Sequence, residues 1–242
     1  MRKHFLFLTV LQILFSQCLS ASHSFYIGAV LSQNAISGKR SDSVTNITPT
    51  PAILTHNKGV HTKAAYGGMV AGYLFRIENF GIGPEFFYNY GKLESTISGQ
   101  HIDNLLGPVN TAFDITHKAT NQYGAHIRLG YFLDSYFGYV LLGIHLQTSQ
   151  FYAKARQDQA AGALNEYEYL TKKKKKNAFS FGLGAQKAIA ENYAIGLECK
   201  FARFPKKNFI WNLQDGALVQ TKLTGSLKYQ MRSISLKLMY IF

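Results

Sequence analysis

The chain has 242 residues, among them 18 Phe, 15 Tyr and 21 Gly, and its mean hydropathy is −0.06. A hydrophobic fraction of 47% excludes a disordered chain, and no segment after residue 20 approaches the roughly 20 apolar residues that a membrane-spanning helix needs. Lys and Arg exceed Asp and Glu by 26 to 13, and this net charge of +13 bears on partners rather than on fold.

The N-terminal segment has the features of a secretory signal peptide. Its start is basic at positions 2–4, an apolar run covers 5–15, and small residues surround Ala21. We therefore expect residues 1–21 to be a signal peptide and residues 22–242 to form one domain. After that cleavage Cys199 is the only cysteine, so the mature chain has no internal disulfide.

Apolar and polar residues alternate through most of the remaining sequence, which predicts β-strands with one apolar and one polar face. The alternation is clearest over residues 122–132, 179–186 and 233–242. We predict eight strands, which in chain order cover 24–34, 63–77, 80–93, 119–133, 137–152, 177–189, 193–204 and 226–242.

Short and long connections alternate between these strands. Three predicted hairpins turn on an acid, a small polar residue and an aromatic residue, namely Glu78-Asn79-Phe80, Asp134-Ser135-Tyr136 and Glu191-Asn192-Tyr193. The long connections cover 35–62, 94–118, 153–176 and 205–225. Within the last of these, Asp215-Gly216 predicts a hairpin turn, so the seventh and eighth strands are expected to continue past their buried parts.

Alternation does not say which face meets water, because a soluble barrel puts its apolar face inside and a membrane barrel puts it outside. The polar face carries too many charges for an apolar core, and the turn and loop lengths are those of membrane barrels. Aromatic residues also gather at strand ends, as an interfacial girdle does: Phe75, Phe80, Tyr136, Phe137 and Tyr193. We predict an all-β, eight-stranded antiparallel up-and-down transmembrane β-barrel with short periplasmic turns and long extracellular loops.

With its export signal, its eight strands and its final strand Ile234–Phe242, the chain resembles the OmpA/OmpX-like outer-membrane β-barrel family, which includes opacity-type surface antigens. The resemblance is architectural and covers the whole mature chain. It implies a bacterial outer membrane with cell-surface loops. It also implies that Leu238, Tyr240 and Phe242 form the signal that the barrel-assembly machinery reads.

The interior of the predicted barrel is polar. Counting residues from the short turns places each large polar side chain opposite a glycine, in the pairs Glu85–Gly72, His126–Gly143, His145–Gly124, Glu198–Gly184 and Lys200–Gly182. Large residues opposite small ones fill a narrow barrel. We therefore predict a shut lumen with a polar network, in which Arg128 pairs with Glu85, made up of Glu85, His126, Arg128, His145, Glu198 and Lys200. A small diffusion or hydrophobic-solute channel is the alternative.

The sequence predicts neither a metal site in the lumen nor a catalytic site in the loops. His126 and His145 are diagonal neighbours that could share an ion with Glu85, but neutral histidines bonded to carboxylates are favoured, so no metal or cofactor is expected. Lipid-modifying enzymes exist on this fold, yet the loop pairs His101 with Asp103 and Thr116 with His117 bring no recognisable partner. We predict no enzyme.

Basic residues gather in the long connections, three of which have a net positive charge. At the foot of the third loop stands a run made up of Lys172, Lys173, Lys174, Lys175 and Lys176. Such a run predicts contact with polyanions, either the phosphates of lipopolysaccharide or acidic host glycans and matrix. Nucleic acid is not expected as a partner, since these loops face outside the cell. We expect a monomer.

Overall fold

The structure, a computed structural model, describes residues 21–46, 53–103, 109–158, 164–170, 174–215 and 219–242. These residues form β-strands joined by turns. The strands are β1 (Ala21–Asn46), β2 (Ile53–Ile77), β3 (Phe80–Gly91), β4 (Leu93–Asp103), β5 (Val109–Leu133), β6 (Tyr136–Asp158), β7 (Leu164–Leu170), β8 (Lys174–Ala190), β9 (Tyr193–Arg203), β10 (Lys207–Asp215) and β11 (Val219–Ile241). Among the residues described, no helix is long and apolar enough to cross a membrane.

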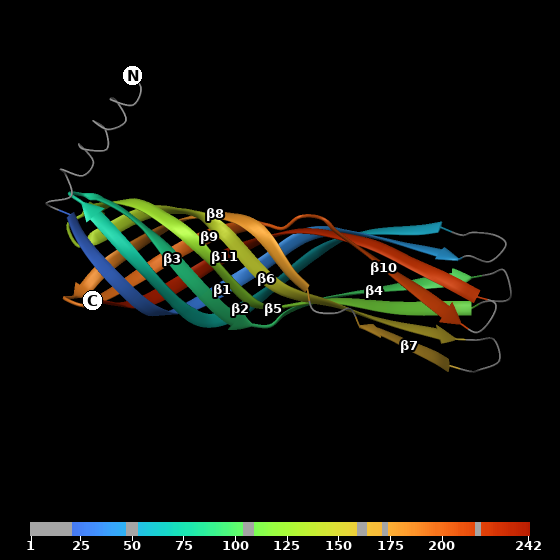
Figure 1. The fold of residues 1–242 in the computed structure, drawn as a ribbon. Helices are drawn as coiled ribbons and strands as arrows, with labels where there is room; N and C mark the ends of the chain where they lie inside the picture. The colour runs from blue at the N-terminus through green and yellow to red at the C-terminus, as the bar shows by residue number, and fades with distance from the viewer. Residues whose placement is uncertain (1–20, 47–52, 104–108, 159–163, 171–173, 216–218) are drawn as a thin grey trace, which may run out of the picture.

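The strands close into a ring. Antiparallel pairing runs β1–β2–β3–β5–β6–β8–β9–β11 and returns to β1, so eight strands enclose the barrel. The short strands β4, β7 and β10 belong to the outer part, where each extends the wall beside β5, β6 and β11 respectively. Figure 1 shows a long barrel with the described ends of the chain at one end. The predicted eight-stranded up-and-down barrel is confirmed.

The register of the hairpins is the predicted one. Glu85 pairs with Gly72, His126 with Gly143, His145 with Gly124, Glu198 with Gly184 and Lys200 with Gly182. This agreement follows from turn chemistry: Glu78 and Asp134 take positive φ angles of 54° and 51°, which tight two-residue turns require. Because the side-chain period is 2, the turns decide which residues face inward.

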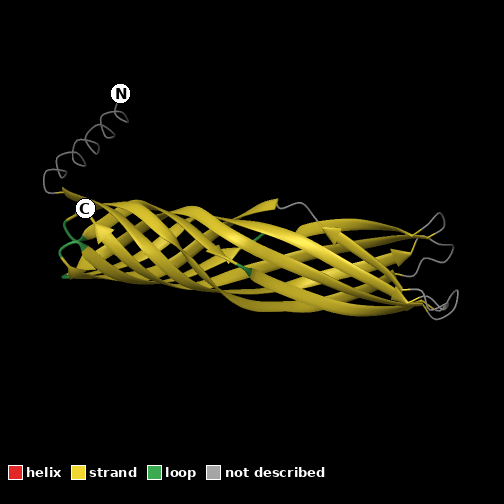
Figure 2. Cartoon of the chain, turned by 90° about the horizontal axis from the view of Figure 1, so that it is seen from below, coloured by secondary structure: helices red, strands yellow, loops and turns green. Residues whose placement is uncertain are grey.

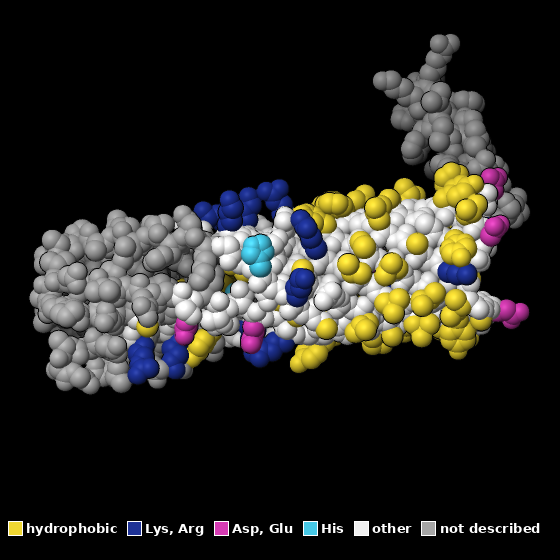
Figure 3. Space-filling view, turned by 180° about the vertical axis from the view of Figure 1, so that it is seen from behind, with side chains coloured by type: hydrophobic (Ala, Val, Ile, Leu, Met, Phe, Trp, Pro, Cys, Tyr) yellow, Lys and Arg dark blue, Asp and Glu magenta, His cyan; other side chains and the backbone are white. Residues whose placement is uncertain are grey.

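The faces of the barrel are inverted relative to a soluble protein. Its outer surface carries large apolar side chains, including Leu31, Met69, Phe86, Ile127, Leu129, Leu142, Ile144, Phe179, Leu183, Leu197, Ile234, Leu236 and Leu238. Polar side chains are buried inside, among them Asn34, Glu85, Gln122, His126, Arg128, His145, Gln147, Ser180, Glu198, Lys200, Ser233, Ser235 and Lys237. Figure 3 shows the apolar belt around the half of the barrel that holds the short turns. This arrangement is that of a barrel spanning a lipid bilayer.

The aromatic residues at the strand ends divide between the two faces. Phe80, Tyr136 and Tyr193 are 62%, 49% and 48% exposed beside the short turns, as an interfacial girdle requires. Phe137, predicted to belong to that girdle, is 1% exposed and points inward. The prediction was wrong there because Tyr136 and Phe137 are neighbours in one strand, and neighbours face opposite sides.

The connections predicted as long loops are largely strands. Hydrogen-bonded pairing continues to Asn46–Thr221 in β1 and β11, to Asp103–Val109 in β4 and β5, and to Asn110–Asp158 in β5 and β6. A hairpin does form at the expected place, but Asp215 is the last residue of β10 and pairs with Val219, so the predicted two-residue turn Asp215-Gly216 is wrong. Extension of the other strands was missed because above the apolar belt the sequence loses the strict alternation on which the prediction rested.

The outer part of the barrel is two sheets rather than a closed wall. One sheet has the order β2–β1–β11–β10 and the other β4–β5–β6–β7, and within the described residues neither β7 with β10 nor β2 with β4 forms a ladder. Figure 2 shows the strands of this part continuing beyond the closed barrel. The wall is therefore interrupted above the points where β8 and β9 stop pairing.

Candidate functional site: the barrel interior and its basic outer surface

An ion-pair network crosses the middle of the interior. Lys237 Nζ lies 2.6 Å from Glu85 Oε1 and 2.5 Å from Glu198 Oε2, and so bridges the two carboxylates. Arg128 Nη1 lies 3.3 Å from Glu85 Oε2, which is the predicted pair, and Lys200 Nζ lies 3.0 Å from Glu198 Oε1. All of these charged groups are almost fully buried. The network therefore ties β3, β5, β9 and β11 together through the lumen.

Lys237 was absent from the predicted network although it is the residue that joins its two halves. Its position in the sequence could have predicted its role, because Lys237 follows Ser233 and Ser235 on the polar face of the last strand. A lysine near the middle of a membrane strand on the interior face needs an anionic partner. Two such partners stand on β3 and β9.

Aromatic side chains enclose the Arg128 guanidinium on the side of the short turns. Its Cζ lies 3.8 Å from the ring centroid of Tyr139 and 5.4 Å from those of Tyr26 and Phe137. Arg128 Nη1 also donates a 2.8 Å hydrogen bond to Tyr26 Oη, and Nη2 a 2.9 Å bond to Gln186 Oε1. Cation–π contacts of this kind are strong where water is excluded. Arg128 thus fills the section of the lumen next to the short turns.

Glycines give these large side chains their room. A Cβ at Gly72 would meet the Tyr26 phenol, and one at Gly184 would meet the Tyr139 ring. At Gly143 the added atom would meet the Ala125 carbonyl and the His126 ring. Of these three glycines, Gly143 makes room for its predicted partner His126, whereas Gly72 and Gly184 make room for the tyrosines of their other neighbouring strands. The lumen is filled at this level.

The two lumen histidines do not bind carboxylates. His126 Nε2 shares a 3.0 Å hydrogen bond with Ser180 Oγ, and both nitrogens of His145 lack a hydrogen-bond partner within the described residues. Both rings instead pack on Phe87, at centroid distances of 4.8 and 5.3 Å. No group of three potential metal ligands occurs among the residues that the structure describes. The expected histidine–carboxylate bonds are therefore wrong, because Phe87 occupies that space.

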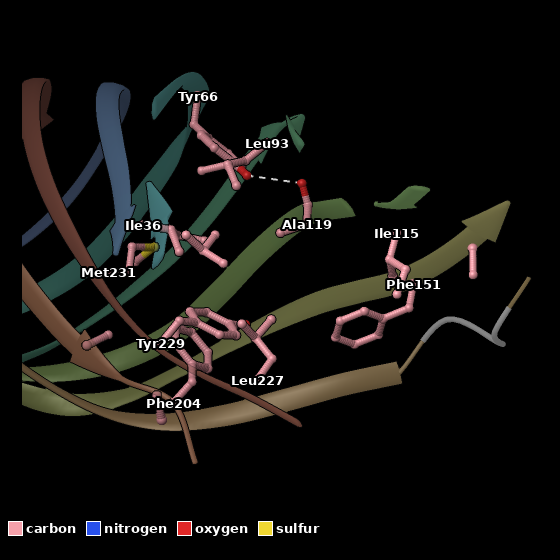
Figure 4. Close-up of a cluster of buried hydrophobic side chains, with 14 residues drawn as sticks. Ile36, Tyr66, Leu93, Ile115, Ala119, Phe151, Phe204, Leu227, Tyr229 and Met231 are labelled. Atoms are coloured by element: carbon pink, nitrogen blue, oxygen red, sulfur yellow. Dashed lines mark hydrogen bonds between the residues drawn. The ribbon is translucent and has the colours of Figure 1, made fainter. Parts of the chain in front are cut away.

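Above the ionic network the interior becomes apolar and aromatic. Figure 4 shows this cluster, in which the Tyr66 hydroxyl donates a 3.2 Å hydrogen bond to the Ala119 carbonyl oxygen. Phe204 stacks on Tyr229 at 4.7 Å between centroids. The lining residues are Ile36, Val60, Tyr66, Leu93, Ile115, Ala119, Phe151, Ala153, Ala178, Ala202, Phe204, Leu227, Tyr229 and Met231. We call this set the upper interior cluster.

The lysine run is a strand start rather than a loop surface. Lys174 and Lys175 are exposed at the beginning of β8, whereas Lys176 is 6% exposed and faces inward. Its Nζ lies 4.7 Å from the Tyr229 ring centroid and 5.2 Å from that of Phe151. Lys172 and Lys173 lie outside the described residues. Strand alternation thus removes Lys176 from the predicted surface patch.

The remaining predicted positions are divided between interior and surface. His117 packs between Phe151 and Tyr229 inside the barrel, and Thr116 Oγ1 is 2.8 Å from Thr96 Oγ1. The side chains of His101 and Asp103 lie outside the described part, as do residues 1–20 of the expected signal peptide. The final strand presents Leu238 and Phe242 outward, at 52% and 68% exposure, and Tyr240 accepts a 3.0 Å hydrogen bond from Asn192 Nδ2.

Basic side chains gather at the outer edge of the apolar belt, on the face of the barrel that Figure 3 shows. We call them the basic collar: Lys39, Lys63, Lys92, Lys118, Lys174, Lys175, Arg203, Lys206, Lys228 and Arg232. On one side Lys92 and Lys118 pair with Glu94 at 3.0 and 3.5 Å. Slight burial would raise the pKa of the Glu94 carboxyl, but these lysines hold that pKa below its usual value.

No protein-family model matches the chain, and no curated protein matches it by sequence. Several solved structures are similar in shape. The Escherichia coli outer membrane protease OmpT has 14% identity and a TM-score of 0.42, over 90% of this chain and 97% of that one. OprG of Pseudomonas aeruginosa has 13% identity and a TM-score of 0.45, over 91% and 96%. The attachment invasion locus protein Ail of Yersinia pestis, in complex with sucrose octasulfate, has 13% identity and a TM-score of 0.28, over 85% and 98%.

Proposed function

We propose that this chain is a monomeric surface protein of a bacterial outer membrane. Its filled barrel anchors it, and its basic outer part contacts polyanions, either lipopolysaccharide or acidic host glycans and matrix. The observation that carries the proposal is the basic collar directly above the apolar belt (Figure 3). Side chains at that height meet the phosphorylated and sugar-bearing zone of an outer leaflet, where cations are stabilised.

A binding role agrees better with the interior than a catalytic one. The charged groups in the lumen are held by one another, and Arg128 is also enclosed by aromatic rings. Nucleophilic catalysis needs a base within hydrogen-bond reach of an accessible nucleophile. His126 bonds to Ser180, but both residues are buried next to Phe87 and Lys200 rather than open to a substrate.

The test replaces the four lysines of the run that precede Lys176. Lys172→Gln, Lys173→Gln, Lys174→Gln and Lys175→Gln, combined in one variant, should leave the barrel folded, because surface substitutions such as those at the exposed Lys174 and Lys175 usually change stability by no more than about 0.5 kcal/mol. Adhesion of cells to heparin-coated surfaces should fall, and wild-type adhesion should fall in high salt, since exposed charges are screened over about 8 Å at physiological ionic strength. Equal adhesion of variant and wild type would leave the lysines only a role toward the cell's own lipopolysaccharide.

Passage of a small apolar solute is a second candidate, and the apolar and aromatic residues of the upper interior cluster favour it, although His117 and Lys176 pack against Phe151 and Tyr229 at the same level. The ionic network below that cluster argues against an open pore. We expect the wild type to give little or no steady conductance in planar bilayers. Large, stable channels would promote this second function over the first.

A further inference from the structure

The barrel wall is interrupted beside Pro205. The β8–β9 ladder ends with Phe179 paired to Arg203, and the backbone N–H of Phe204 makes a last bond to the Tyr229 carbonyl at 3.0 Å. Pro205 has no N–H, so the ladder toward β11 breaks there and resumes at Lys207 with Leu227 as its partner. Above this break, β8 pairs only with β6 among the described strands.

A surface groove lies at the interruption. Its walls include Ile144 and Phe179 of the apolar belt, Asn177, and the basic residues Arg203 and Lys228, with Pro205 at the break. Ile144, Phe179 and Arg203 stand side by side in one row across β6, β8 and β9. The groove therefore joins a lipid-facing apolar surface to two cations.

The cations beside the groove lack an anionic partner among the residues that the structure describes. In the described part of the chain no carboxylate lies within ion-pair distance of Arg203, Lys228 or Lys39, in contrast to Lys92 and Lys118 on the other side. Lys228 and Lys39 also stand directly opposite one another in the β1–β11 ladder. Like charges in directly opposed positions destabilise a sheet. An external anion between them would remove that repulsion.

We propose that this groove binds a phosphorylated acyl lipid of the surrounding leaflet. The phosphate lies against Arg203 and Lys228, near Lys39, and an acyl chain runs along Phe179 and Ile144 toward the apolar belt. A guanidinium offers paired N–H donors that match phosphate oxygens, and Asn177 adds an amide. The proposal rests on the membrane placement of the barrel given above, but not on contact between the lysine run and glycans.

The experiment measures lipid retention by the detergent-folded mature chain with native mass spectrometry. The probe is lipid A, compared with phosphatidylcholine, whose phosphate is neutralised by its own choline. We expect one tightly held lipid A on the wild type and weaker retention of phosphatidylcholine. The pair Arg203→Gln with Lys228→Gln should lower the affinity for lipid A about tenfold, because two charge-assisted contacts are lost.

The matched control is Lys92→Gln with Lys118→Gln, which removes the same charge from the other side of the collar. It should retain lipid A within about twofold, since a rim charge without a contact has little effect on affinity. Heat-modifiable electrophoretic mobility reports that each variant is folded. The proposed site would be overturned if both double variants lost the same affinity for lipid A, or if the Arg203→Gln, Lys228→Gln variant lost none. Binding of phosphatidylcholine as tight as that of lipid A would also overturn it.

Two further measurements distinguish a lipid site from a site for free phosphate and from the proposed contact with glycans. Soluble glucosamine phosphate, which has the headgroup chemistry without acyl chains, should not displace bound lipid A at equal concentration. Displacement would mean that the groove is a site for free phosphate, and the lipid proposal would fail. The variant with four of the run lysines changed to Gln should keep its lipid A, so loss of heparin adhesion and loss of the lipid are independent results.

Discussion

Lys237 Nζ donates a 2.6 Å hydrogen bond to Glu85 Oε1 from the last strand of the barrel to the third, although 152 residues separate the two in sequence. The same ammonium group reaches Glu198 on β9. Two carboxylates that would repel one another across the lumen are therefore held by one cation. Closure of the barrel and formation of this bridge require each other.

Glu85→Ala should lower the free energy of unfolding of the detergent-folded barrel by about 3–5 kcal/mol, because it leaves Lys237 and Arg128 short of a buried partner. Lys237→Met should cost a similar amount, since each of the two buried carboxylates then loses one of its two cationic partners. Thermal unfolding followed by circular dichroism measures both. Glu94→Gln is the control: Glu94 also pairs with two lysines but is exposed, so we expect a loss of no more than about 1 kcal/mol.

Gly184→Ala should destabilise the barrel by about 1–3 kcal/mol, because the added Cβ meets the Tyr139 ring, whose hydroxyl bonds to Glu198. Gly138→Ala is the matched variant. Gly138 lies on the neighbouring strand, faces outward, and has no atom within 4 Å of the added Cβ. Equal melting temperatures for the two variants would show that the lumen is not packed at Tyr139.

The orientation of the barrel can be read by cysteine labelling of intact cells. In a Cys199→Ala background, Asp114→Cys in the outer part of β5 should react with an impermeant maleimide, and Ser135→Cys in the second short turn should not. Reaction at position 135 alone would reverse the predicted topology. The background substitution is needed because Cys199 is a free, exposed thiol on the outer face.

Deletion of Phe242 should reduce assembly in the outer membrane while secretion continues. Its backbone N–H donates a 2.9 Å bond to the Phe25 carbonyl, and its ring lies 5.5 Å from the Phe25 ring, so the residue also fastens the closing pair β1–β11. Phe242→Tyr keeps the aromatic ring and should assemble normally. Heat-modifiable protein in the membrane fraction measures assembly, and removal of the signal peptide measures secretion.

The barrel could be predicted from sequence because its strands and turns depend on neighbouring residues. Contacts across the lumen could not be predicted, because they depend on how distant strands are placed relative to one another. Period-2 alternation and the short turns determine the register, which is why Glu85–Gly72 and His126–Gly143 could be paired from sequence. Residues that meet across the lumen, such as Lys237 with Glu85, come from strands that are not neighbours and whose relative height depends on the tilt of the whole barrel. The outer strands were missed because their two faces do not differ in polarity.

The five lysines before Asn177 have one further consequence, which concerns insertions and deletions. A one-residue change of length in a strand exchanges its inner and outer faces. Here a deletion or duplication within the run leaves a lysine at the position beside Tyr229 and Phe151, and still leaves lysines outside. The segment between β7 and β8 can therefore change length by a residue without losing the interior cation. Because the residues of the run are identical, gain or loss of one of them does not change which residue type faces the interior at the start of β8.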